Sequence, residues 1–246
     1  MCAHAHDQPS MSLVLDGTFR ERMGNVTETL RPLSVSLMPN GVPHQDEFGP
    51  LGARLLTVSF SGQLERELSR YSSSLATWRW IHGGAVVRVF VDLWRGLRES
   101  MPPNALESLV IDAMAAASTT VVARARGTPP RWLEHARGAI DDGRGWPKVS
   151  DLAAEAGVHR VYLARQFKRF YGWTVSAYVR CRCLQSAAAD ITRTSARLST
   201  IAHDNGFSDE AHLCRTFGAT TGLTPSAFRE LTGRFHRFNR TDNAEL

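Results

Sequence analysis

The residues with the clearest chemical potential form one pattern that occurs twice. Leu-x-Arg-x-Phe-x4-Gly begins at Leu163 and again at Leu213. In a helix, Leu and Phe four positions apart share one face, and the arginine between them, Arg165 or Arg215, faces the other way. An arginine on an exposed helix can form two hydrogen bonds to guanine or bind a phosphate. A single such residue is equally explained as a solubilising surface group, but its recurrence favours a binding role.

Each arginine is expected to lie in the second helix of a helix-turn-helix unit. Upstream of the two motifs, the segment "LAAEAGV" from Leu152 matches "IAHDNGF" from Ile201. Gly157 in the first segment and Gly206 in the second allow a sharp turn. Small alanines before both turns let the two helices cross closely. The sequence therefore predicts two units of the same build.

Serines are predicted to start two of these helices, because a serine oxygen accepts a hydrogen bond from a free backbone N–H. Ser150 would cap the first helix of the first unit, and Ser208 the second helix of the second unit. Between the units, residues 175–193 have helical apolar spacing, with Arg180 and Arg182 on the polar side. One rigid connecting helix would hold the two second helices apart, and adjacent major grooves are about 34 Å apart on one DNA face.

The positive charge is concentrated in the same half of the chain. The net charge is +5, yet residues 1–128 hold 12 basic and 12 acidic side chains, whereas residues 129–246 hold 17 and 12. The stretch 160–182 contains six basic side chains and no acidic one. A charge run can be a solvated helix face, but a local excess of this kind is expected of a surface that meets phosphate. The second unit carries less charge and is expected to hold DNA less firmly.

Composition excludes several classes of protein. The 246 residues are 43% hydrophobic, which is enough for one or two cores. No apolar run reaches the roughly 18 residues of a membrane span, and the N-terminus lacks a signal-peptide pattern, so a cytoplasmic protein is expected. The four cysteines, at Cys2, Cys181, Cys183 and Cys214, have the spacing of neither a zinc ribbon nor a disulfide framework. We expect them to be reduced thiols.

Residues 131–234 resemble the DNA-binding domain of the AraC/XylS bacterial transcription regulators. The most specific stretch is "LSTIAHDNGFSDEAHLCRTFGATTGLTPSAFR", residues 198–229, which is similar to the closing signature of that family. The chain departs from the family at His159, where a serine usually caps the first recognition helix. The resemblance implies recognition helices in two successive major grooves of a promoter. The groove-facing positions that it implies are Arg160, Val161, Ala164, Arg165, Lys168, Glu210, Ala211, His212, Cys214 and Arg215.

The first sixty residues are expected to form short strands. The runs "MSLVLDG", "LSVSLMP" and "ARLLTVSF" alternate between apolar and polar residues. The segments "HAH" and "PNGVPH" resemble the two signatures of cupin barrels, the usual sensor domain of the AraC/XylS family. That resemblance raises a three-nitrogen metal site at His4, His6 and His44. The carboxylate that usually joins such histidines would fall near Ser10 or Met11, so we expect no metal and no cofactor, and histidines that line turns or a ligand pocket.

From Leu64 onward the pattern is predicted to be helical. The segments "AVVRVFVDLWRGLRES" and "ALESLVIDAMAA" each place apolar residues on one stripe. Core packing explains such stripes, and a dimer seam is the alternative, because helices here often pair subunits in related regulators. The segment "ARARGTPPR", residues 123–131, is the best candidate for a linker.

Together these features predict an α+β protein in four parts. They are a partial cupin-like sensor domain at 1–61, a helical spacer at 62–128, an AraC-type DNA-binding domain at 129–235 and a flexible tail at 236–246. We expect a transcription regulator without catalytic residues, controlled by a small-molecule effector, with double-stranded DNA and a second copy as partners and no membrane. Two alternatives stay open. One is a metal-dependent cupin enzyme fused to a DNA-binding domain, and the other is a DNA-repair regulator that accepts alkyl groups on cysteine.

Overall fold

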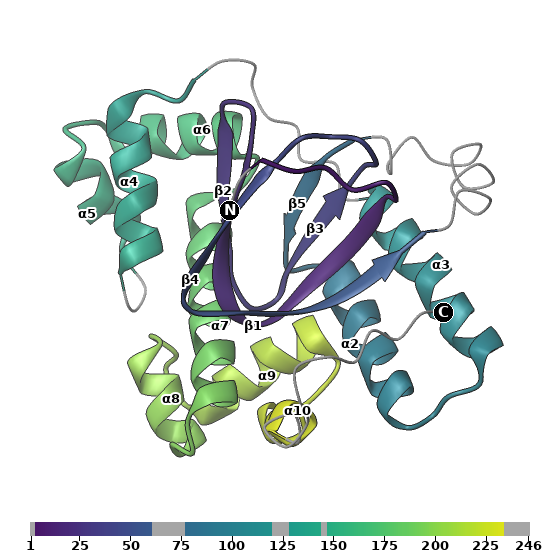
Figure 1. Cartoon of the computed structure of the whole chain (residues 1–246). Coiled ribbons are helices and arrows are strands. Elements are labelled where there is room, and N and C mark those ends of the chain that lie inside the picture. Colours follow the sequence, from purple (N-terminus) through teal and green to yellow (C-terminus); the bar gives the residue numbers. More distant parts are fainter. Residues whose placement is uncertain (1–2, 61–76, 120–127, 144–146, 234–246) are drawn as a thin grey trace.

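The computed structural model describes residues 3–60, 77–119, 128–143 and 147–233. Within these ranges the strands come first and the helices follow, so the predicted α+β class is confirmed. A curled sheet lies between a pair of helices on one side and the C-terminal helices on the other (Figure 1). The predicted linker at 123–131 lies mostly outside the described residues, and Cys2, Leu64 and the tail at 236–246 lie outside them entirely.

The sheet is antiparallel and is built around one long strand. Its strands are β1 (Ser10–Met23), β2 (Val26–Leu30), β3 (Ser34–Met38), β4 (Gln45–Ser59) and β5 (Arg79–His82). β1 pairs with β2, β3 and β4, while β5 pairs with β3. β1 bends at Gly17, which has a φ of +83° and lies between two irregularities in the pairing with β4. A Cβ at this position would lie 2.2 Å from the oxygen of Gly52, so the bend that curls the sheet requires glycine.

The three alternating runs coincide with strands β1, β3 and β4, as predicted. Alternation places successive side chains on opposite faces of the sheet. On one face, Leu13 and Val35 are fully buried in the main core. On the other face, Phe19, Trp78 and Trp80 form a smaller cluster inside the curl. Each face of the sheet thus packs against a cluster of buried apolar side chains.

Among the described residues, the predicted helical stretch contains a strand that the sequence did not predict. Instead of helix throughout from Leu64, β5 runs from Arg79 to His82 and completes the sheet beside β3. The strand was missed because its four residues are too few to show a period. The helices that follow are α2 (Ala85–Arg98) and α3 (Pro103–Thr119). The predicted stripe of α2 is core, since Val86, Phe90 and Trp94 are buried.

Seven helices of the described residues make up the C-terminal half. They are α4 (Arg131–Asp142), α5 (Val149–Glu155), α6 (Arg160–Tyr171), α7 (Val175–Arg193), α8 (Leu198–Asp204), α9 (Glu210–Thr221) and α10 (Pro225–Gly233). The pairs α5–α6 and α8–α9 lie at opposite ends of α7 (Figure 1). Their buried side chains join those of the sheet and α2 in one continuous core. The position of both units is therefore set by α7 and by the N-terminal half.

Candidate nucleic-acid interface and ligand cavity

The two helix-turn-helix units make the same turn with the same bonds. Gly157 and Gly206 have φ values of +66° and +76°, in the left-handed region that favours glycine. Directly after each glycine the backbone N–H donates to an alanine oxygen, from Val158 to Ala153 and from Phe207 to Ala202, and both distances are 2.9 Å. The prediction of two like units from the sequence repeat is confirmed at this level of detail.

The second helices are capped by His159 and Asp209, and only the cap of α9 differs from the predicted one. His159 replaces the usual serine before α6, and its Nδ1 accepts a hydrogen bond from the N–H of Val161 at 3.3 Å. Asp209, rather than Ser208, caps α9, because its extended backbone places its carboxylate 2.6 Å from the N–H of His212. That bond holds the pKa of Asp209 below its ordinary value.

Ser150 does not cap α5, although the sequence predicted that it would. α5 begins at Val149, so Ser150 lies in its first turn and its hydroxyl donates to Asp151 instead. A serine one or two positions away from the N-cap has the residue type that is typical of a cap, but its hydroxyl does not reach the free N–H groups. The prediction at this position was therefore wrong by two residues.

The outward face of α6 is strongly basic. Leu163 and Phe167 are fully buried, whereas Arg165 on the opposite side is exposed. The predicted groove-facing residues of this helix are all exposed: Arg160, Val161, Ala164, Arg165 and Lys168. The apolar side chain of Val161 is 62% exposed, so an apolar contact with a partner would remove it from water.

The outward face of α9 is closer to neutral. Leu213 and Phe217 are fully buried, and Arg215 is exposed. The other predicted positions of this helix are the exposed Glu210 and Ala211 and the half-buried His212 and Cys214. Since an acid accompanies the arginine on this face, α9 attracts phosphate less than α6 does.

One predicted basic residue is removed from the surface. Arg182 in α7 was expected on the polar side, but it is 6% exposed. Its Nε donates to Asp141 at 2.6 Å and its Nη1 donates to Gln185 at 2.7 Å. Tyr178 also donates to Asp141, at 2.7 Å, and accepts from Nε of Arg137 at 3.0 Å. These groups form a buried network between α4 and α7, so Arg182 is a structural residue.

The sheet is tied to this network and to α7 directly. Arg137 forms an ion pair with the buried Glu28 of β2. The side-chain N–H of Gln185 in α7 donates to the hydroxyl of Ser34 in β3 at 2.9 Å. Near the end of α7, Arg193 donates to Asp16 at 2.7 Å, beside the bend of β1. β1, β2 and β3 therefore contact α4 and α7, the helices on either side of the first unit in the chain.

The second unit is held by α2. Arg88 donates to the backbone oxygens of Gly218 and Ala219, both at 3.2 Å, at the C-terminal end of α9. A cation is favourable there because the carbonyl oxygens of the last helical turn point outward and carry partial negative charge. The ring of Trp94 in α2 lies edge-on to Phe228, with 6.1 Å between the ring centres. The orientation of α9 thus depends on the N-terminal half.

Comparison with known proteins identifies the family of these helices. A family model described as a helix-turn-helix domain matches residues 152–231, from α5 through α10. The probable transcription factor PqrA of Proteus vulgaris is 36% identical over 83 residues, which make up 34% of this chain and 68% of that protein. A putative AraC-like transcription regulator of Streptomyces lividans is 33% identical over 90 residues, which make up 37% of this chain and 29% of that protein. This chain belongs to the AraC-type family of transcription regulators.

Membership in this family confirms the predicted class of DNA-binding transcription regulator. A solved structure of an AraC-type regulator from Chromobacterium violaceum is 27% identical and covers 42% of this chain and 94% of its own, with a TM-score of 0.40. Among the described residues of the regulator, no helix is both long enough and apolar enough to cross a bilayer.

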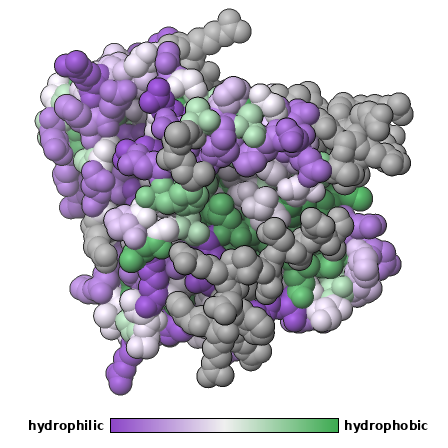
Figure 2. Space-filling model, in the orientation of Figure 1, coloured by the Kyte–Doolittle hydropathy of each residue, from purple (hydrophilic) through white to green (hydrophobic). Residues whose placement is uncertain are grey.

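The curled sheet of the regulator borders an open cavity of about 620 Å³. Glu21, Ser36 and Phe48 line it together with residues of the N-terminal segment before β1. Apolar side chains gather around the centre of this face of the molecule (Figure 2). Ser36 donates to the Glu21 carboxyl at 2.8 Å, and the indole N–H of Trp80 donates to the same oxygen. Burial nevertheless raises the pKa of Glu21 to about 7, so this group is half-protonated near neutral pH.

The pH dependence of stability is expected to carry the signature of Glu21. Because the folded state binds this proton up to about pH 7 and the unfolded state only to about 4.5, the contribution is complete below pH 4.5 and is lost as the pH rises to 7. At about 1.4 kcal/mol per pKa unit, the loss is on the order of 3 kcal/mol. Chemical denaturation in chelator-containing buffer at several pH values measures it. Glu21→Gln should flatten the curve, the exposed Glu47→Gln should not, and parallel curves for all three proteins would contradict the assignment.

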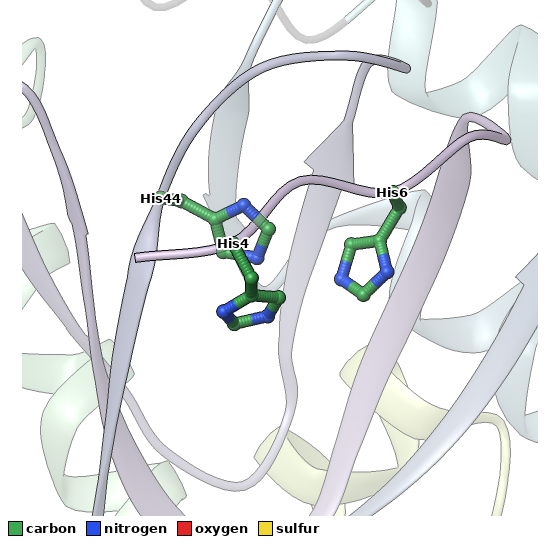
Figure 3. A group of neighbouring side chains, drawn as sticks. All are labelled: His4, His6 and His44. Atoms are coloured by element: carbon green, nitrogen blue, oxygen red, sulfur yellow. The ribbon is translucent and has the colours of Figure 1, made fainter. Parts of the chain in front are cut away.

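Three histidines named from the sequence lie together beside the cavity, and two of them, His4 and His6, line it. The side chains of His4, His6 and His44 extend toward one another (Figure 3), and one ring nitrogen from each lies within 4.8 Å of the others. Burial, with the neighbouring His44 and His4, lowers the pKa of His6. Asp46, which the sequence reasoning did not name, lies 3.8 Å from the Nε2 atoms of both His4 and His44. Histidine and carboxylate groups together are the donors of transition-metal sites.

Proposed function

We propose that the regulator reads a promoter with α6 and α9 in two successive major grooves. The supporting observation is that two like helices, each exposing the arginine of the repeated motif, lie at the two ends of α7. The 19 residues of α7 span about 28 Å, near the separation of about 34 Å between adjacent grooves. In this proposal Arg165 and Arg215 contact bases, and Arg160 and Lys168 of α6 hold phosphates.

Arg165→Ala and Arg215→Ala are each expected to weaken operator binding by about 1–3 kcal/mol, because each would remove a paired hydrogen bond to a base. Fluorescence anisotropy on DNA from the regulator's own upstream region measures the change. Arg20→Ala is the matched control, since Arg20 is 58% exposed on the sheet, away from both units. Unchanged affinity in both α6 and α9 variants would refute the groove-facing assignment. Loss in Arg165→Ala alone would limit the reading role to α6.

We propose further that the cavity binds a small polar effector. Its volume of about 620 Å³ fits the usual range of ligand pockets, and it presents polar groups such as Glu21 within an apolar surround. The contacts of β2 and β3 with α4 and α7 give a bound molecule a route to the recognition helices. Thermal-shift screening of metabolites, repeated on Glu21→Gln, tests this part of the proposal. A hit that shifts both proteins equally would argue against binding in the cavity.

The part of the chain that binds DNA is proposed to be residues 129–235, and the assembly a homodimer. α3 exposes Ile111 at 56%, an apolar side chain on a helix that packs mainly against α2. Sedimentation of the wild-type chain and of Ile111→Asp tests the dimer, and a monomer at micromolar concentration would refute it.

The cysteines of the described residues argue against transfer of alkyl groups to thiols. Cys183 is buried, and Cys181 and Cys214 are partly buried. Burial raises the pKa values of Cys181 and Cys183 to about 12 each, so both stay protonated and are poor nucleophiles at neutral pH. Burial also raises the pKa of Cys214. Since all three are free thiols, they are explained as small apolar residues of α7 and α9.

A further inference from the structure

The backbone brings the three histidines together by strand pairing. His4 and His44 exchange two hydrogen bonds of 2.9 Å, in an antiparallel bridge just before β4. His4 and His6 are two positions apart in an extended segment, so their side chains emerge on one face. The N–H of Gly41 donates to the oxygen of His6 at 2.8 Å and fixes that segment further along. Main-chain hydrogen bonds therefore fix the backbone positions from which the three rings extend.

The buried ring of His44 has one nitrogen in a hydrogen bond and one without a hydrogen bond among the described residues. Its side chain is 0% exposed, and its Nδ1 lies 3.1 Å from the backbone oxygen of Val42. A carbonyl oxygen only accepts hydrogen bonds, so Nδ1 carries a proton, and in the neutral ring the lone pair is on Nε2. Within the described part of the chain, Nε2 has no hydrogen-bond partner. A buried acceptor left in this state is costly unless something occupies the space beside it.

The distances between the histidine nitrogens are close to those between the ligand atoms of a metal site. The ring centres of the histidines are 4.3 to 5.1 Å apart. In a tetrahedral zinc site with Zn–N distances of about 2.0–2.1 Å, ligand atoms are about 3.4 Å apart. The observed nitrogen separations of up to 4.8 Å need only small ring movements to reach that value. Asp46, two residues after His44 on β4, supplies a carboxylate 3.8 Å from two of the nitrogens.

We propose that His4, His6, His44 and Asp46 bind one divalent transition-metal ion. Three imidazole nitrogens with one carboxylate favour zinc and its neighbours over calcium or magnesium, which require sets of oxygen donors. The carboxylate comes from β4 and not from the positions of Ser10 and Met11, which are buried in β1. The ion joins the segment before β1 to β4 and closes one side of the cavity. This inference does not depend on the DNA-binding proposal, so either can fail alone.

Titration of zinc into the full chain, freed of any purification tag and treated with chelator, tests the site. One ion per chain is expected with submicromolar affinity, and calcium should not compete. His6→Gln alters an exposed residue and should leave the fold intact. It should weaken binding by at least tenfold, since even loss of an outer-shell partner costs about 10- to 100-fold. Asp46→Asn should weaken binding similarly, and His135→Gln, an exposed histidine of α4, should have no effect.

Cobalt provides a structural readout of the same site. The ring of Trp78 lies 5.0 Å from that of His44, so bound cobalt should quench tryptophan fluorescence in the wild type and less in His6→Gln. The visible bands should be those of nitrogen and oxygen ligands. Bands of a cobalt–thiolate bond, wild-type affinity in His6→Gln, or the lack of stoichiometric zinc would each overturn the proposal. Wild-type affinity in Asp46→Asn would overturn the assignment of the carboxylate.

Discussion

Asp141→Ala is expected to lower the free energy of unfolding by about 3–5 kcal/mol, the usual cost of removing one partner from a buried ion pair. Asp141 accepts hydrogen bonds from Arg182 and Tyr178, and Arg182 is 6% exposed. Without the carboxylate, the buried guanidinium group of Arg182 would lose its ion-pair partner, whereas Arg137 would keep Glu28. Urea denaturation followed by circular dichroism measures the loss.

The neighbouring Asp142 offers a matched control because it is exposed in the same helix. Asp142→Ala should change the free energy of unfolding by no more than about 0.5 kcal/mol. Combining Asp141→Ala with Arg182→Met should restore part of the stability, since the second change removes the uncompensated charge. Equal stability of the two single variants would show that the network between α4 and α7 is not a stabilising element.

Phe228→Ala is expected to cost about 3–5 kcal/mol, the range for removing a buried aromatic ring. Phe228 is fully buried in α10, where its ring centre lies 5.2 Å from that of Phe217 in α9 and 6.1 Å from that of Trp94 in α2. Because the ring packs against both halves, the variant should loosen α9 from α2 as well as from its own unit. DNA binding should therefore weaken even though the side chain of Phe228 is fully buried.

Thermal unfolding, followed by tryptophan fluorescence and by circular dichroism, measures this effect. Ser226→Ala, an exposed position of the same helix, should leave the midpoint unchanged within a few degrees. If Phe228→Ala kept wild-type stability, or if its loss were confined to the sheet, the packing of α10 between the halves would not be the cause.

The helix-turn-helix repeat could be predicted because its information is local. A glycine at the turn, an apolar pair four residues apart and an arginine between them appear within a dozen positions, and each has a separate physical reason. The same locality explains why the exposure of Arg165 and Arg215 followed from helical geometry alone. Caps were less predictable, since moving a helix start by one residue transfers the role from Ser208 to Asp209.

Features that depend on distant partners could not be predicted in this way. Arg182 lies on the polar side of a helical projection, and only its contact with Asp141, 41 positions earlier, makes it a buried residue. Asp46 becomes a candidate ligand only because an isolated backbone bridge joins His4 to His44, two residues before Asp46. β5 is similar, because its four residues are a strand only through their pairing with β3.

Strand β3 carries two contacts that are only two residues apart. Ser36 binds Glu21 at the cavity, and Ser34 accepts the hydrogen bond from Gln185 of the helix that separates α6 and α9. Residues at this spacing are about 7 Å apart along a strand, so β3 cannot shift at one contact without moving the other. Thermodynamic linkage makes any such coupling reciprocal. Promoter DNA would then be an effector of the cavity, changing its affinity for a small molecule by the factor with which that molecule changes the affinity for DNA.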